Sequence, residues 1–113
     1  MIPKKHRLTK QAEVIATTAR GRSFFSGSFV FKTLPDHKND KVKFTVIVSN
    51  KISKSAVVRN RLKRLIREAI RPNLEKMKVG KYAIIVKRSA ILVSGKDLSA
   101  EVKTALIKSK VLL

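Results

Sequence analysis

The N-terminal half of the chain contains two short, mainly apolar segments bounded by turn-like residues, and each predicts a strand. These segments cover residues 28–34 and 43–49, and both are rich in β-branched and aromatic side chains. Phe24 and Phe25 predict a short strand before them, and residues 35–40 have the Pro, Asp and Asn composition of a turn. The pattern therefore predicts a meander of two or three antiparallel strands.

Two segments before and after these strands have the apolar spacing of amphipathic helices. The first helix is expected over residues 9–20, with Thr9 as its N-cap and Gly21 as its stop signal. The second is expected over residues 56–71, after two serines that can cap it, and it should end before Pro72.

The C-terminal third predicts one more strand and one more helix. Residues 82–86 form a continuous apolar run, and residues 98–108 have helical periodicity with Ser99 as the expected N-cap. The order along the chain is then αβββαβα, and a strand, a helix and a strand between residues 43 and 86 form a crossover unit. We therefore expect an α+β fold, a two-layer α/β sandwich whose mixed sheet contains this βαβ crossover.

The chain has 113 residues, the length of one domain, and we expect a single domain over residues 1–113 with a basic leader at about residues 1–8. Leu, Ile, Val and Phe make up about a third of the residues, which is enough to bury a core. The formal net charge is +20, from 27 Lys and Arg against 7 Asp and Glu. Because so much like charge repels itself, the composition favours a polyanionic partner such as nucleic acid.

The composition also excludes several classes of protein. The absence of cysteine excludes disulfide scaffolds, thiolate-bound zinc and thiol nucleophiles, and it fits a cytoplasmic protein. No apolar run has membrane-spanning length, and the N-terminus does not have the pattern of a signal peptide. We therefore expect no membrane as partner. With two histidines and seven scattered carboxylates, we also expect no catalytic site, no metal site and no small-molecule partner.

The helix expected over residues 56–71 carries the clearest binding signal. At about 100° per residue its apolar side chains share one arc, which should face the core: Val58, Leu62, Leu65, Ile66 and Ala69. The rest of its surface is almost entirely cationic, and only Glu68 adds a negative charge. A merely solvated face usually mixes both signs, whereas a face of arginines suits contacts with phosphates and stacking on bases.

An arginine-rich helix can enter the DNA major groove, bind folded RNA or lie on an anionic membrane. The apolar arc has no aromatic residue that could anchor a membrane interface, and the extended segment before the helix does not fit a helix-turn-helix. RNA is therefore the favoured partner. A ribosomal or other structural RNA-binding protein would have the same size, the same charge and the same lack of catalytic groups.

Residues 57–67, with the sequence Val-Val-Arg-Asn-Arg-Leu-Lys-Arg-Leu-Ile-Arg, resemble the Arg-Asn-Arg signature helix of the bacterial ribonuclease P protein subunit. The resemblance covers nearly the whole chain, and further residues carry it: Lys5-His6-Arg7-Leu8, Gly21, Ser49-Asn50-Lys51 and the strand at 82–86. In that family a small basic protein assists a large catalytic RNA, which hydrolyses precursor tRNA to release the 5′ leader. The resemblance implies that the catalytic RNA and precursor tRNA are the partners, and that Mg²⁺ serves the holoenzyme and is held mainly by RNA.

The resemblance also implies two RNA-binding sites. The first, on the signature helix, contacts the catalytic RNA and comprises Arg59, Asn60, Arg61, Lys63, Arg64 and Arg67. The second, a cleft between the sheet and the first helix, receives the single-stranded leader, and the strand residues in it depend on which alternate positions face the cleft. The residues expected there are Arg7, Val14, Thr18, Phe29, Phe31, Lys32, Ser49 and Lys51.

The chain departs from the family pattern in this second site. Val14 and Thr18 stand where the family usually has aromatic residues on the first helix, and Lys32 stands where it often has a tyrosine. Stacking contributes roughly 1–3 kcal/mol per base. We therefore expect this chain to bind the leader more through charge and less through base stacking than its aromatic-bearing relatives.

Overall fold

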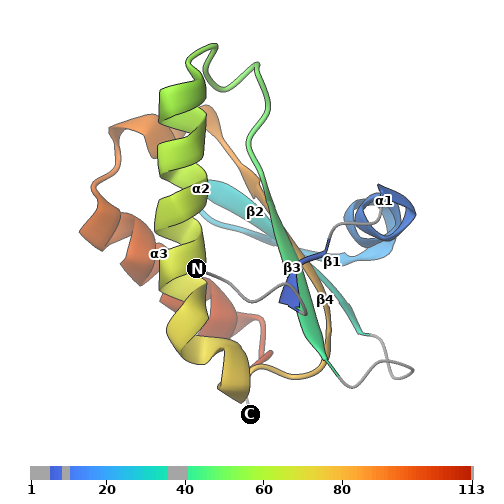
Figure 1. Cartoon of the computed structure of the whole chain (residues 1–113). Coiled ribbons are helices and arrows are strands. Elements are labelled where there is room, and N and C mark those ends of the chain that lie inside the picture. The colour runs from blue at the N-terminus through green and yellow to red at the C-terminus, as the bar shows by residue number, and fades with distance from the viewer. Residues whose placement is uncertain (1–5, 9–10, 36–40, 113) are drawn as a thin grey trace.

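The structure, a computed structural model, describes residues 6–8, 11–35 and 41–112, and its sheet lies between two layers of helix (Figure 1). The predicted order αβββαβα is confirmed by α1 (Gln11–Arg20), β1 (Arg22–Phe25), β2 (Phe29–Pro35), β3 (Val42–Ile47), α2 (Ala56–Ile70), β4 (Gly80–Val86) and α3 (Gly95–Lys108). Two short 3₁₀ helices, η2 (Arg71–Lys76) and η3 (Arg88–Leu92), follow α2 and β4. Thr9, the predicted cap of the first helix, and residues 36–40 of the predicted loop lie outside the described residues.

The four strands form one mixed sheet in the order β1-β2-β4-β3. β2 is antiparallel to β1 and β4, whereas β3 is parallel to β4 and reaches it through α2. The predicted α+β class and βαβ crossover are therefore confirmed. A meander of three strands is wrong, because β4 lies between β2 and β3 and only β1 and β2 form a hairpin. β4 takes the centre because its apolar run can be buried on both faces of the sheet.

α2 and α3 cover one face of the sheet and enclose the core with it (Figure 1). Alternate strand residues point into this core, among them Phe29 and Phe31 of β2, Phe44 of β3 and Ile84 of β4. Phe31 stacks on Tyr82 with ring centroids 5.7 Å apart and ring planes 4° from parallel. The predicted two-layer sandwich describes this part of the molecule. α1 packs against the opposite face and adds a short third layer (Figure 1).

The apolar arc predicted for α2 faces the core as expected. Leu62 and Ile66 are completely buried, and the other residues of the predicted arc are half-buried against the same cluster. Ser55 caps the helix, since its hydroxyl accepts a hydrogen bond from the backbone N–H three residues further on, at 3.4 Å. The α-helix ends at Ile70 because Pro72 lacks an N–H, and the chain continues as η2.

α3 begins one turn earlier than predicted. Its N-cap is Ser94, not Ser99, and the Ser94 hydroxyl accepts a hydrogen bond from the backbone N–H of Asp97 at 3.1 Å. Gly95 is the first helical residue, and the first turn contributes nothing apolar to the core before Leu98. Glycine has a low helix propensity, so this turn is stabilised by its cap and not by its own sequence.

A carboxylate on α3 fixes the turn between β1 and β2. Glu101 accepts hydrogen bonds from the hydroxyl and the backbone N–H of Ser28 and, at 2.5 Å, from the hydroxyl of Ser26. Partial burial raises the pKa of this carboxyl, but the hydrogen bonds from Ser26, Ser28 and the backbone of Gly27 outweigh burial and bring the pKa below its ordinary value of 4.5. The hairpin is thus tied to α3 by a charged group.

Candidate nucleic-acid interface

The residues predicted to contact the catalytic RNA lie on the side of α2 that faces away from the core. Asn60, Arg61, Arg64 and Arg67 are exposed, and Arg59 and Lys63 are half-buried at the margins of the helix surface. Among the described residues, none of the α2 arginines forms an ion pair with a carboxylate. Their charges are therefore available to an anionic partner. We call these six residues the cationic face of α2.

The loop between β3 and α2 brings residues of the two predicted sites together. A hollow of about 520 Å³ at the N-terminal end of α2 is lined by Asn50, Lys51, Lys54 and Arg59. The Arg59 guanidinium donates a hydrogen bond to the carbonyl of Ser53 at 2.7 Å, which holds its side chain over this loop. Lys51, predicted for the leader site, thus shares a surface with Arg59, predicted for the catalytic RNA.

Arg88 of η3, which no sequence pattern marks as a binding residue, belongs to the same surface. Its exposed guanidinium donates a hydrogen bond to the carbonyl of Lys51 at 2.8 Å. Arg88 follows Lys87 after β4, far along the chain from Lys51, so only the fold reveals that the two residues meet. Ser49 is exposed where the chain leaves β3, and its carbonyl accepts a hydrogen bond from the N–H of Ile52 at 3.0 Å.

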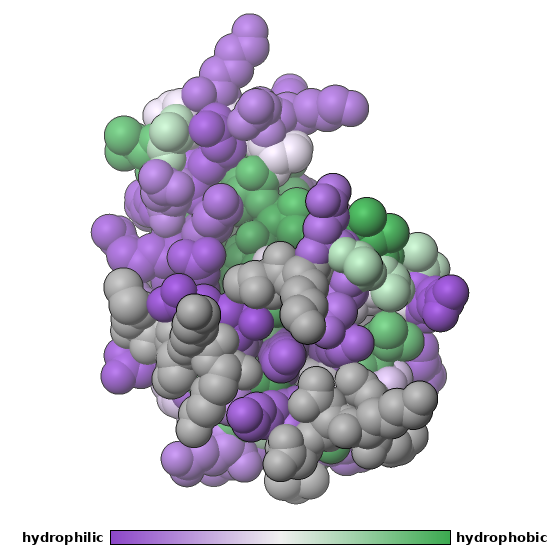
Figure 2. Space-filling view, turned by 45° about the vertical axis from the view of Figure 1, so that its right-hand side comes forward, coloured by the Kyte–Doolittle hydropathy of each residue, from purple (hydrophilic) through white to green (hydrophobic). Residues whose placement is uncertain are grey.

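The second predicted site corresponds to the sheet face that α1 partly covers, which we call the α1 face. Figure 2 shows this side of the molecule, where apolar surface lies between hydrophilic side chains. The strand register places two rows of side chains across it, Val30–Ile85–Ile47 and Lys32–Ala83–Thr45. All of these except Ala83 are half-buried, whereas their neighbours along each strand are buried in the core. The α1 face therefore offers an apolar strip beside a cation.

Phe29 and Phe31 do not lie on the α1 face, contrary to the prediction that they line the leader cleft. Both point toward α2 and α3, and at most 1% of either residue is exposed. Because side chains alternate along a strand, their burial places Val30 and Lys32 on the α1 face. The Lys32 ammonium donates a hydrogen bond to the hydroxyl of Ser23 at 2.5 Å, within this face.

Val14 and Thr18, the predicted α1 residues of the site, are half-buried beside the sheet. Thr17 between them is completely buried against the sheet. At about 100° per residue, Val14 and Thr18 lie on one flank of Thr17, and Glu13 lies on the other. Glu13 is 4.0 Å from the ammonium of Lys81 on β4. Val14 and Thr18 therefore border the α1 face.

Phe25, which is not among the predicted leader residues, extends the apolar row. It pairs with Val30 in the β1–β2 ladder, and 77% of its surface is exposed. The ammonium of Lys87 lies 5.9 Å from its ring centroid. The sequence signal was the pair Phe24-Phe25, but the pairing of β1 with β2 decides which of the two rings is exposed. An exposed ring on a sheet is a stacking platform for unpaired bases.

Arg7 lies at the outer edge of β3. It forms a parallel bridge with Phe44, and the N–H of Leu8 donates a hydrogen bond to the carbonyl of Phe44 at 2.9 Å. Leu8 is buried and Arg7 is exposed. The predicted leader residue Arg7 is thus held by the backbone at the edge of the sheet, beside Phe44, whose own side chain lies in the core.

Among the described residues, no three His, Asp or Glu side chains lie close enough together to hold a metal ion. In the same part of the chain, no helix is long and apolar enough to cross a bilayer. The two surfaces offer cations, hydrogen-bond donors and apolar side chains, which is the chemistry that binds RNA strands.

Known proteins share both the sequence and this fold. The family model described as Ribonuclease P matches residues 2–110. The ribonuclease P protein component of Microcystis aeruginosa is 32% identical over 115 residues, covering 98% of this chain and 96% of that protein, and that of Rippkaea orientalis is 35% identical, covering 98% and 91%.

Solved structures agree with the fold. The RNase P protein of Staphylococcus aureus superposes with a TM-score of 0.90 at 24% identity, covering 97% of this chain and 100% of that chain. The RNase P protein of Thermotoga maritima gives a TM-score of 0.78 at 21% identity, covering 90% and 96%. With the family model matched over almost the entire sequence, this chain belongs to the family of bacterial ribonuclease P protein components.

Proposed function

We propose that this protein component binds the catalytic RNA of ribonuclease P through the cationic face of α2 and receives the 5′ leader of precursor tRNA on the α1 face. The observation that carries the proposal is the surface of α2, where exposed arginines without carboxylate partners among the described residues surround Asn60. Arginine contacts phosphate through two parallel hydrogen bonds and stacks on bases, so such a surface suits folded RNA.

The α1 face supports the second half of the proposal. A single strand needs cations for its phosphates and flat apolar surface for its bases. Lys32 supplies a cation beside the row Val30–Ile85–Ile47, and Phe25 with Lys87 extends that row at the edge of the sheet. The hollow lined by Lys51 and Arg59 lies at the loop that connects β3 of the sheet to α2, so one small domain can bind the catalytic RNA and the leader.

We infer that the RNA performs the cleavage and that the protein contributes binding and charge. As the family resemblance implies, we assign the Mg²⁺ of the holoenzyme mainly to RNA. The net charge of +20 reduces the repulsion between two large RNAs, which bulk cations would otherwise have to screen. We place this reaction in the cytoplasm, the compartment expected for a chain without cysteine.

The test compares two triple variants with equal loss of charge. The first removes arginines of the cationic face: Arg61→Ala, Arg64→Ala and Arg67→Ala. The second removes exposed lysines elsewhere: Lys76→Ala, Lys96→Ala and Lys103→Ala. Binding to the catalytic RNA is measured against salt concentration, and each lost phosphate contact lowers the slope of log K against log salt by about 0.7–0.9.

We expect the first variant to lose about two to three units of slope and the lysine variant to change little. Both should keep the wild-type circular dichroism spectrum, because all six positions are exposed. Equal losses in the two variants would show that only total charge matters, and the proposed face of α2 would be wrong.

A further inference from the structure

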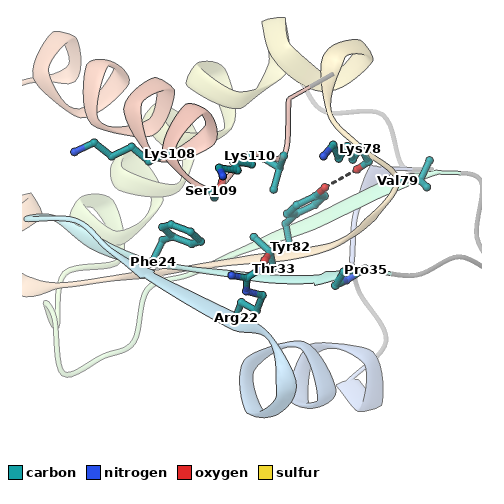
Figure 3. Close-up of a pocket in the computed structure, with 11 residues that line it drawn as sticks. Arg22, Phe24, Thr33, Pro35, Lys78, Val79, Tyr82, Lys108, Ser109 and Lys110 are labelled. Atoms are coloured by element: carbon teal, nitrogen blue, oxygen red, sulfur yellow. Dashed lines mark hydrogen bonds between the residues drawn. The ribbon is translucent and has the colours of Figure 1, made fainter.

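A second basic hollow lies on the other side of the sheet from the α1 face, where the C-terminal end of α3 approaches β1 and β2 (Figure 3). Its volume is about 590 Å³, within the range of about 300–1,000 Å³ that small ligands occupy. Phe24 and Tyr82, which line it, belong to the core-facing side of their strands, so the sheet separates this hollow from the α1 face. We call it the α3 hollow.

The floor of the α3 hollow is apolar and aromatic. Phe24 is partly buried against the core, and in Figure 3 its ring borders the space below the end of α3. Tyr82 is 3% exposed, and its hydroxyl donates a hydrogen bond to the carbonyl of Lys78 at 2.5 Å. Burial raises the pKa of Tyr82 to about 12, so the hydroxyl stays protonated. Val79 and Val111 complete a surface on which a flat base can lie.

The rim of the α3 hollow is cationic. Arg22, Lys78, Lys108 and Lys110 come from three separate parts of the chain, and no Asp or Glu of the described residues lines the hollow. The C-terminal end of α3 carries the negative pole of the helix dipole, which by itself repels an anion. Lys108 in α3 and Lys110 just after it therefore decide whether this end of the helix attracts phosphate.

Lys110 occupies a backbone conformation that usually selects glycine. Its φ is 58°, and the chain ends α3 with the paired hydrogen bonds of a Schellman motif, from Lys110 N–H to the Ile107 carbonyl and from Val111 N–H to the Leu106 carbonyl. A β-carbon costs free energy in this conformation, and glycine avoids that cost. The chain thus carries a lysine where glycine would give a more stable helix end, which indicates a use for its charge.

We propose that the α3 hollow binds an unpaired nucleotide of a single-stranded RNA segment, with its base on Phe24 and its flanking phosphates on Lys108 and Lys110. A duplex presents phosphates but keeps its bases stacked inside, so it cannot use the aromatic floor. A free nucleotide can use the floor but has phosphate on one side only. The inference rests on the proposed function in taking RNA as the partner, and it adds a third RNA contact on the side of the sheet away from the α1 face.

The test is an NMR titration of the isotope-labelled full chain with an oligouridylate of about six nucleotides at low salt. The amide signals of Phe24 and Lys110 report on the α3 hollow, and those of Val30 and Thr45 report on the α1 face. We expect both sets to shift, each with its own affinity. Uridine monophosphate should move the signals of the hollow with an affinity about tenfold lower, because it lacks the second phosphate.

The variants separate the hollow from the general charge of the protein. Lys108→Ala with Lys110→Gly should weaken binding in the hollow by about tenfold and leave the affinity of the α1 face at the level of the control. The control, Lys96→Ala with Lys103→Ala, removes the same charge from exposed positions of α3 outside the hollow. Lys110→Gly alone should raise the melting temperature, so a loss of binding in it cannot come from unfolding.

Three results overturn the inference. The signals of the hollow do not move when the oligonucleotide is added, or they respond to the monophosphate as strongly as to the oligonucleotide. In the third result, they titrate alike in the double variant and in the control. In each case, shifts at the α1 face leave the proposed function intact. Shifts in the hollow without shifts at the α1 face have the opposite meaning, because they support the α3 hollow and overturn the leader site.

Discussion

Replacing Glu101 by Ala should detach the β1–β2 hairpin from α3 and destabilise the whole domain. The carboxylate accepts hydrogen bonds from the Ser26 hydroxyl and from both the hydroxyl and the backbone N–H of Ser28. Ser28 is only 2% exposed, so without the carboxylate its polar groups have little access to water. The same hairpin carries Phe25 on the α1 face and Phe24 in the α3 hollow.

The magnitude follows from the two polar groups of Ser28 that lose their partner. An unsatisfied buried donor costs about 1–3 kcal/mol. Because Glu101 itself is half-exposed, screening by water keeps the free energy lost with each hydrogen bond at the low end of that range. We therefore expect Glu101→Ala to lower the free energy of unfolding by about 2–3 kcal/mol, or roughly 10 °C in melting temperature for a domain of this size.

The effect should also depend on pH. Because the folded pKa of Glu101 is lowered, the unfolded chain takes up a proton first as the pH falls. The stabilising contribution is complete above the ordinary carboxyl pKa of 4.5 and is lost as the pH falls below it, through the lower folded pKa. The difference in stability between wild type and Glu101→Gln should therefore be constant near neutral pH and shrink in acid.

Urea unfolding followed by circular dichroism, at neutral and acidic pH, measures both expectations. Glu68→Gln is the matched control, because Glu68 is exposed on α2, and it should change stability by less than about 0.5 kcal/mol. A Glu101→Ala variant as stable as this control, or a difference that does not change with pH, would refute the role given to the carboxylate.

Three further predictions concern the core and the leader site. Leu62→Ala, at a completely buried position of α2, should cost about 2–5 kcal/mol in urea unfolding, and a smaller loss would mean that α2 does not pack as described. Val14→Phe with Thr18→Phe should tighten binding of a precursor with a long leader by about 1 kcal/mol and leave mature tRNA unchanged, and an unchanged ratio of the two affinities would remove α1 from the leader site. Phe25→Ala should weaken the same long-leader complex by about 1 kcal/mol in the same assay, with circular dichroism as the check on folding, and equal binding would exclude Phe25 as a stacking platform.

The element order could be predicted because local patterns and tertiary packing agree in most of this chain. The apolar arc of α2 predicts an amphipathic helix, and the continuous apolar run of β4 predicts a buried strand. The start of α3 could not be predicted, because Gly95 interrupts the helical pattern and the cap at Ser94 stabilises a turn without core residues. The pairing of β4 between β2 and β3 is a long-range contact that no local pattern contains.

In the candidate site, too, some features could be predicted from local sequence and others depend on long-range packing. The cationic face of α2 could be predicted because all its residues lie on one helix at helical spacing. β2 has substantial side chains on both faces, and Phe29 and Lys32 could each have faced the leader until the packing of α2 and α3 selected the phenylalanines for the core. The α3 hollow could not be predicted at all, because its walls come from β1, β2, β4 and the end of α3, which are far apart in sequence.

The central claim is that this protein assists an RNA catalyst and does not itself cleave. The most direct measurement adds purified, RNA-free protein to precursor tRNA with and without the catalytic RNA, over a series of Mg²⁺ concentrations. We predict that the protein alone leaves the precursor intact and that it lowers the Mg²⁺ concentration at which the RNA releases the leader, because a charge of +20 replaces cations in the complex. Leader release by the protein alone, or an unchanged Mg²⁺ requirement in its presence, would contradict the account.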